Sequence, residues 1–165
     1  LNTKNYKDLS LTTKLYNGQL IPNIGFGTWK LDQVELNIIN AIKIGYRHID
    51  TASLYKNEKE IGNALKIAFS ENLVTRGEMF IVTKIWNTDH EDPLSAIKTS
   101  LENLQLDYVD SYLIHWPIGK VENNKLVKST PIHELWANME KLVDMGLTKS
   151  IGVSNFKVQL LLDLL

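Results

Sequence analysis

Four polar residues whose chemistry suits proton transfer stand at the ends of four short segments: Asp50, Tyr55, Lys84 and His115. A lysine ammonium favours a nearby phenolate, so we expect Lys84 to lower the pKa of Tyr55 from about 10. Asp50 would hold Lys84 in place and keep it charged. His115 can donate a hydrogen bond to the substrate oxygen and stabilise negative charge there. The set is typical of a site that moves a proton at a carbonyl oxygen while a hydride arrives or leaves.

Length and composition fit one ordinary domain. The 165 residues are 44% hydrophobic, which is enough for a substantial core, so we expect a single domain over residues 1–165. With 18 basic and 19 acidic residues, no overall charge points to nucleic acid or to an anionic membrane. The absence of cysteine excludes disulfides and thiolate metal sites and suits a reducing compartment, so we expect a cytoplasmic location. The chain has no apolar run of about 18 residues and no leader pattern, so neither a spanning nor a secreted chain is expected.

Short apolar segments alternate with helical patterns after an N-terminal β-hairpin. The hairpin is predicted over residues 11–21, because Asn17-Gly18 can form a turn with positive φ. Helix starts are indicated by side chains that cap, by glutamate three residues later or by a following proline. These predicted starts are Asp32, Asn57, Asp92-Pro93, Thr130-Pro131 and a point near Phe156, from which the last helix runs to Leu165.

The apolar segments between the helices are predicted to be strands buried on both faces. They cover residues 24–26, 48–49, 80–83, 112–114 and 151–153. Strict β-α alternation indicates a parallel sheet with right-handed crossovers, made of five βα units. Residues 118–129 are polar and are predicted to be an irregular surface loop near a site.

Functional groups of parallel α/β folds gather where the strands end at their carboxyl ends. A charged lysine or aspartate at such a place is costly if it is buried alone, so we expect Lys84 and Asp50 to pair. In chain order the residues that follow or end the five strands are Thr28, Trp29 and Lys30; Asp50 and Tyr55; Lys84 and Trp86; His115 and Trp116; and Ser154 and Asn155.

Several longer motifs in this order resemble those of the aldo-keto reductases, from Lys14 to the end of the chain. They are LYNGQLIP, GFGTWK, GYRHIDTA, LQLDYVDSYLIHWP and IGVSNF. The resemblance implies a (β/α)8 barrel that the N-terminal hairpin closes at its base. It also implies reduction of an aldehyde or ketone with NADPH and without a metal.

Site roles follow from the resemblance, position by position. It implies that Tyr55 is the general acid, that Lys84 and Asp50 tune it, and that His115 orients the carbonyl group. The residues that would bind the cofactor are Thr28, Trp29, Lys30, Asp50, Ser154 and Asn155, the last two at the nicotinamide carboxamide. The residues that would wall an apolar substrate pocket are Trp29, Trp86 and Trp116.

The chain lacks part of what the family pattern contains. Three further strands, the residue that stacks on the nicotinamide and the basic groups for the 2′-phosphate do not occur in it. It also begins at Leu1 and ends without a helix C-cap, so we interpret it as an incomplete view of a longer protein, although a truncated product or a half-barrel held by partners is the alternative. The complete barrel would be a monomeric carbonyl reductase. A truncated form would be a non-catalytic structural or regulatory subunit of a larger assembly.

Three other features have simpler explanations than a site. Gly25-Phe26-Gly27 lacks the third glycine of a dinucleotide-binding fingerprint, so close packing is the better interpretation. Residues 89–92 could suggest a metal site, but a solvated loop with a helix cap is favoured. His48 starts a strand and is predicted to be a core histidine with its hydrogen bonds satisfied.

Overall fold

A five-stranded parallel sheet is the centre of the fold in the computed structural model, which describes residues 11–123 and 125–164. Each strand pairs in parallel with its neighbours, which confirms the predicted βα units. The strands in spatial order are β3 (Phe26–Gly27), β4 (His48–Asp50), β5 (Phe80–Ile85), β6 (Ser111–Ile114) and β9 (Ile151–Val153). The helices between and after them are α1 (Val34–Lys43), α2 (Glu58–Ser70), α3 (Pro93–Leu104), α4 (Ile132–Asp144) and α5 (Val158–Leu162).

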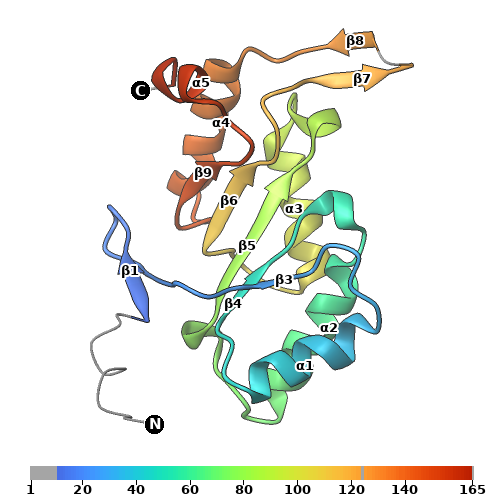
Figure 1. The fold of residues 1–165 in the computed structure, drawn as a ribbon, viewed down its shortest axis with the longest axis vertical. Helices are drawn as coiled ribbons and strands as arrows, with labels where there is room; N and C mark the ends of the chain where they lie inside the picture. The colour runs from blue at the N-terminus through green and yellow to red at the C-terminus, as the bar shows by residue number, and fades with distance from the viewer. Residues whose placement is uncertain (1–10, 124, 165) are drawn as a thin grey trace, which may run out of the picture.

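Helices α1 to α4 bury their apolar stripes against one face of this sheet. The strand β5 is buried along its whole length, and its Ile81 and Ile85 belong to the same core as the apolar residues of the helices. Figure 1 shows α1, α2 and α3 together beside β4 and β5. The core residues from the helices include Ile38, Ile42, Ile61, Leu65, Ile97, Leu104, Leu135 and Met139. Their burial positions the carboxyl ends of the strands rigidly, because close-packed interiors resist displacement.

The N-terminal hairpin consists of β1 (Thr12–Lys14) and β2 (Leu20–Pro22), as predicted. Gly18 has φ of 87°, whereas Asn17 bonds through its side chain. Asn17 Oδ1 accepts from the Gln19 amide at 3.0 Å, and Asn17 Nδ2 donates to the Lys149 carbonyl at 2.9 Å. Because Lys149 lies just before β9, the hairpin is held at the amino ends of the strands, opposite the predicted site.

The predicted helix starts were partly wrong. Asp92 caps α3 as predicted, since its Oδ1 accepts from the Ser95 amide at 2.9 Å. Helix α1 instead starts after Gln33, whose φ is 46°, and Asp32 contributes only its main-chain oxygen to Asn37. Helices α4 and α5 start one to two residues later than predicted, and Leu165 lies outside the described residues.

The prediction of an irregular loop over residues 118–129 was wrong, because this segment contains a second hairpin. Its strands are β7 (Lys120–Glu122) and β8 (Lys125–Lys128), which pair antiparallel. All of these strand residues are exposed, so the segment lacks the buried alternation by which a strand is recognised in a sequence. Figure 1 places the hairpin at the end of the molecule to which the arrows of β5 and β6 point.

Two smaller expectations were confirmed in part, since His48 is only half-buried and a Cβ atom on Gly27 would meet nothing within 4 Å. His48 Nδ1 lies 3.0 Å from the Pro22 carbonyl oxygen, so this half-buried ring has a hydrogen-bonding partner. A Cβ atom on Gly25 would lie 2.9 Å from the same ring, so Gly25 serves close packing. Within the residues that the structure describes, no helix is both long and apolar enough to cross a bilayer.

Candidate active site

The carboxyl ends of β4, β5 and β6 bring the four predicted proton-transfer residues together. Asp50 ends β4, and Tyr55 follows on a single 3-10 turn, η2 (Ser53–Tyr55). Lys84 lies one residue before the end of β5, and His115 directly follows β6. Because these strands are hydrogen-bonded neighbours, residues that are 65 positions apart in the sequence share one edge of the sheet.

Lys84 and Asp50 form the predicted ion pair. Lys84 Nζ lies 2.5 Å from Asp50 Oδ1 and donates a second hydrogen bond to the Thr51 carbonyl at 2.8 Å. Lys84 is 5% exposed, so these two acceptors replace the water that its ammonium group loses on burial. The ammonium group is therefore held at one place in the site.

Tyr55 lies between the ion pair and the histidine. Its ring centroid is 5.2 Å from Lys84 Nζ and 5.6 Å from the centroid of the His115 ring, which it meets edge to face. Cation and imidazole thus both lie beside the same phenol. This arrangement places a proton donor and a hydrogen-bond donor around one common space.

The expectation that Lys84 lowers the pKa of Tyr55 was wrong. The pKa of Tyr55 is raised above its ordinary value, first by burial and second by the negative charge of Asp50. Since Lys84 is paired with that same carboxylate, its positive charge is offset at the tyrosine. Tyr55 is therefore a neutral phenol with its proton in place throughout the neutral range.

His115 is a neutral imidazole in this site. Its pKa is lowered, first by burial and second by the charge of Lys84, while Asp50 opposes the change. The side chain is buried, and its Nδ1 is without a hydrogen-bond partner in the part of the chain that the structure describes. A neutral ring carries one N–H, so it can donate one hydrogen bond to a substrate oxygen without adding a charge.

Two of the three predicted tryptophans line this space. The Trp29 ring lies 4.9 Å from the ring of Tyr55, and the Trp86 ring lies 5.2 Å from His115. Trp116 follows His115 and is 39% exposed, but it makes no ring contact with the other aromatic side chains within residues 11–123 and 125–164. The described structure therefore joins Trp29 and Trp86 to the four polar residues and leaves Trp116 beside them.

Ser154 and Asn155 lie next to the histidine at the end of β9. The Ser154 amide donates to the Ile114 carbonyl at 2.8 Å, and Asn155 Nδ2 donates to the His115 carbonyl at 2.8 Å. Asn155 has φ of 62°, a left-handed conformation that asparagine tolerates better than most residues. A hydroxyl and an amide at this place fit the donors and acceptors of a carboxamide group.

The predicted cofactor residues after β3 are fixed to β4. Thr28 is fully buried, and both its amide and its hydroxyl donate to the Asp50 carbonyl, at 3.0 and 3.1 Å. Lys30 has φ of 54°, and its Nζ lies 5.5 Å from the Trp29 ring. Thr28 thus anchors the segment that carries Trp29 and Lys30, while those two side chains extend outward.

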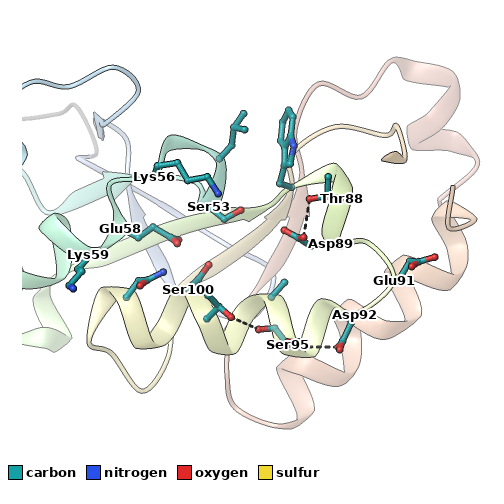
Figure 2. A pocket seen from close by; sticks show the side chains of 15 residues that line it. Ser53, Lys56, Glu58, Lys59, Thr88, Asp89, Glu91, Asp92, Ser95 and Ser100 are labelled. Carbon is teal, nitrogen blue, oxygen red and sulfur yellow. Dashed lines mark hydrogen bonds between the residues drawn. The ribbon is translucent and has the colours of Figure 1, made fainter. Parts of the chain in front are cut away.

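A cavity of about 550 Å³ adjoins the four residues without containing them. It lies between the start of α2 and α3, and it shares Ser53, Leu54 and Trp86 with the segments that carry Tyr55 and Lys84. Figure 2 shows Lys56, Glu58 and Lys59 on one side and Asp89 and Asp92 on the other. The cavity therefore borders the segments that carry Tyr55 and Lys84.

The acidic run 89–92 behaves largely as a capped polar loop. Asp89 accepts from the Thr88 hydroxyl at 2.9 Å, and Glu91 pairs with Lys128 at 2.5 Å. His90 differs from that interpretation, because it is 3% exposed and burial lowers its pKa. No group of three or more histidine, aspartate or glutamate residues in the described ranges could hold a metal ion.

No separate sequence signal pointed to three further residues at this edge, which are Ser53, Asn57 and Glu58. Ser53 Oγ donates to the Lys84 carbonyl at 3.1 Å, and Glu58 accepts from the Thr83 hydroxyl at 2.6 Å. Asn57 was interpreted only as a helix cap, yet its side chain makes no capping bond to α2. Their position in the sequence was the available clue, because all three follow Asp50 within nine residues.

The family is decided by the sequence match together with this geometry. A model described as "Aldo/keto reductase family" matches residues 23–164. The chain belongs to the aldo/keto reductase family. The five-stranded parallel sheet is accordingly part of the (β/α) barrel of that family, and the predicted fold class is confirmed.

Individual aldo/keto reductases are similar over most of the chain. An aldose reductase of Encephalitozoon cuniculi is 49% identical in an alignment of 158 residues that covers 88% of this chain and 52% of that protein. An NADP-dependent D-sorbitol-6-phosphate dehydrogenase of Malus domestica is 45% identical, in an alignment that covers 93% of this chain and 55% of that protein. The crystal structure of a Bombyx mori aldo-keto reductase in complex with NADP matches with a TM-score of 0.87 at 36% identity, over 93% of this chain and 53% of that one. The chain thus spans about half the length of the relatives that it matches.

Proposed function

We propose that the complete protein reduces an aldehyde or ketone to an alcohol with NADPH and that Tyr55 is the general acid. The observation that carries the proposal is the position of the Tyr55 ring, which lies 5.2 Å from the paired Lys84 ammonium and 5.6 Å from the His115 ring. Family membership and an NADP complex of a similar aldo-keto reductase support the same reaction class.

The cofactor would be held from two sides of the site. Ser154 and Asn155 would bind the nicotinamide carboxamide, since they present a hydroxyl and an amide beside His115. Thr28, Trp29, Lys30 and Asp50 would lie along the cofactor. When bound, the nicotinamide supplies the hydride that adds to the carbonyl carbon.

His115 and Tyr55 would act on the carbonyl oxygen in different ways. His115 donates a hydrogen bond from its neutral ring, which orients the carbonyl group and stabilises the negative charge that develops on its oxygen. Tyr55 then gives its O–H proton to that oxygen. A raised pKa suits this step, because the phenol holds its proton until a much stronger base, the alkoxide, forms beside it.

Lys84 and Asp50 would support the tyrosine after the proton has left. The Lys84 ammonium lies near enough to attract the phenolate, and Asp50 prevents the ammonium from moving away. The substrate would enter between Trp29 and Trp86, with Trp116 as the third wall, because apolar walls with few polar groups are typical of small-molecule sites.

The test is a panel of carbonyl substrates with NADPH and NADH, applied to the complete protein and to Tyr55→Phe. Loss of the phenol hydroxyl should lower turnover by at least about 10²-fold and leave NADPH binding nearly unchanged. Tyr46→Phe is the matched control, since Tyr46 packs on Phe26 away from the site. Unchanged turnover in Tyr55→Phe would exclude the tyrosine as the acid.

Lys84→Met tests the supporting cation. We expect lost activity or an altered pH–rate profile, because the phenolate would lose its charged neighbour. Lys66→Met on the exposed side of α2 should retain the activity of the unmodified protein.

A non-catalytic role as a structural or regulatory subunit of a larger assembly is the alternative, and the same panel separates it from the enzyme. It would be supported by binding of a partner protein together with no turnover of any carbonyl compound. A cytoplasmic location and a monomeric complete barrel stay predictions.

A further inference from the structure

Asn57 is a buried asparagine that connects two segments of the candidate site. It is 7% exposed and immediately precedes α2. Its Nδ2 donates to the Thr28 carbonyl at 2.8 Å, and its Oδ1 accepts from the Thr51 hydroxyl at 3.3 Å. One side chain therefore joins the segment after β3 to the segment after β4.

Both partners of Asn57 are bonded directly to the ion pair. Thr28 donates to the carbonyl of Asp50, and the carbonyl of Thr51 accepts from Lys84 Nζ. A shift of the Asn57 side chain would thus be passed to Asp50 and Lys84 through a single intervening residue on each side. Both hydrogen bonds of the Asn57 side chain are buried, where a hydrogen bond that is lost is not replaced by water.

The next residue makes the corresponding contact to β5. Glu58 is 4% exposed, and its Oε1 accepts from the hydroxyl of Thr83, the residue before Lys84. Figure 2 shows Glu58 at the wall of the 550 Å³ cavity, on the same side as Ser53. Adjacent side chains at 57 and 58 thus tie the start of α2 to the ends of three neighbouring strands.

The turn that carries Tyr55 needs such anchors. Lys56, between the tyrosine and Asn57, has φ of 60°, which is unfavourable for a residue with a long side chain. Such a conformation persists only where the surroundings hold it. Ser53 fixes the start of the turn to Lys84, and the pair at 57 and 58 fixes its end.

We propose that Asn57 and Glu58 are positioning residues that set the place of Tyr55 relative to the Lys84–Asp50 pair. Neither side chain needs to touch the substrate. The inference rests on the proposed function only for its effect on turnover, whereas the effect on the position of Tyr55 stands without it.

Turnover tests the first consequence on the complete protein. Asn57→Ala should lower kcat by about 10–100-fold, because a displacement near 1 Å costs that much. In the Tyr55→Phe background the same change should cost nothing further, since a misplaced acid and an absent acid are equivalent. A loss that adds in full to that of Tyr55→Phe would overturn the proposal.

Asn63→Ala is the matched control. Asn63 lies in α2, six residues after Asn57, and also makes two side-chain hydrogen bonds, to Glu35 and Gln105, both at 2.8 Å. It contacts helices and not strand ends, so kcat should stay within about twofold of the unmodified protein. An equal fall of kcat in both variants would make Asn57 a structural residue only.

The position of Tyr55 can be observed without any turnover. In protein with ¹³C-labelled tyrosine, the ring signal that Tyr55→Phe removes should move in Asn57→Ala and stay in place in Asn63→Ala. Thr51→Val, which removes only one hydroxyl, should move it less and in the same direction. If the signal stays in place in both Asn57→Ala and Thr51→Val, the positioning role of Asn57 is refuted. If the signal moves but the complete protein reduces no carbonyl compound, only the proposed function is refuted.

Discussion

Lys84 Nζ lies 2.5 Å from Asp50 Oδ1, and the side chain of the lysine is 6% exposed whereas that of the aspartate is 36% exposed. The cation is thus removed from water and the anion is not. The charge of Asp50 raises the pKa of Tyr55, in addition to the larger effect of burial. Burial and the nearby aspartate together keep Tyr55 a phenol beside a lysine.

Asp50→Asn should move the alkaline limb of carbonyl reduction to lower pH. The negative charge of Asp50 raises the pKa of Tyr55, so its removal lowers that pKa and the acid is deprotonated sooner as pH rises. The pH dependence of kcat measures the shift. Asp89→Asn, on a carboxylate that does not affect the pKa of Tyr55, should leave the limb in place, and a limb that moves upward in Asp50→Asn would contradict the stated cause.

The His115 ring should titrate below its ordinary pKa of 6.5, as followed by ¹³C–¹H NMR of the ring. Lys84→Met should raise the midpoint, because the lysine charge is one cause of the depression. An unfolded chain binds this proton at higher pH than the folded one, so the contribution of His115 to stability is lost as pH falls below about 6.5. A midpoint above 6.5 in the unmodified protein would contradict burial as the main cause.

Asn155→Gly should weaken NADPH binding by about tenfold, which corresponds to about 1.4 kcal/mol, in a fluorescence titration. Glycine keeps the left-handed backbone, so the change removes the amide without strain. Asn72→Gly is the control, since Asn72 has φ of 54° at the exposed end of α2. Equal affinity in Asn155→Gly and the unmodified protein would remove Asn155 from the proposed cofactor site.

Asp110→Ala should destabilise the fold by about 3 kcal/mol in denaturant unfolding. The Asp110 carboxylate is buried, pairs with Arg76 at 2.8 Å and accepts from the Ile81 amide at 3.0 Å, so its removal takes the opposite charge from Arg76 and the acceptor from the Ile81 amide. Asp107→Ala, at an exposed position, should change stability by less than about 0.5 kcal/mol. A similar small change in Asp110→Ala would show that the buried ion pair contributes little.

Local patterns were sufficient to predict the five helices, apart from their exact starts, and the strands of the parallel sheet. Apolar periodicity reports directly on which face of an element is buried, so the five βα units could be recognised in the sequence. The hairpin over residues 118–129 could not, because it is exposed on both faces and shows no such pattern. The prediction that Asp32 caps α1 was also wrong, because the helix starts one residue later, and sequence patterns place a helix boundary only to within one or two residues.

Sequence alone also determined which side chains stand at the strand ends, since order along the chain and the rule for parallel sheets are enough for that. Only the tertiary structure decided the charge state of Tyr55 and the role of Asn57. A pKa depends on burial and on every charge nearby, and at this phenol burial and then the charge of Asp50 raise it. Asn57 looks like an ordinary cap until the fold brings Thr28 and Thr51 within reach of its amide. The charge state of Tyr55 and the role of Asn57 both depend on contacts between segments that only the fold brings together, so no local sequence pattern contains them.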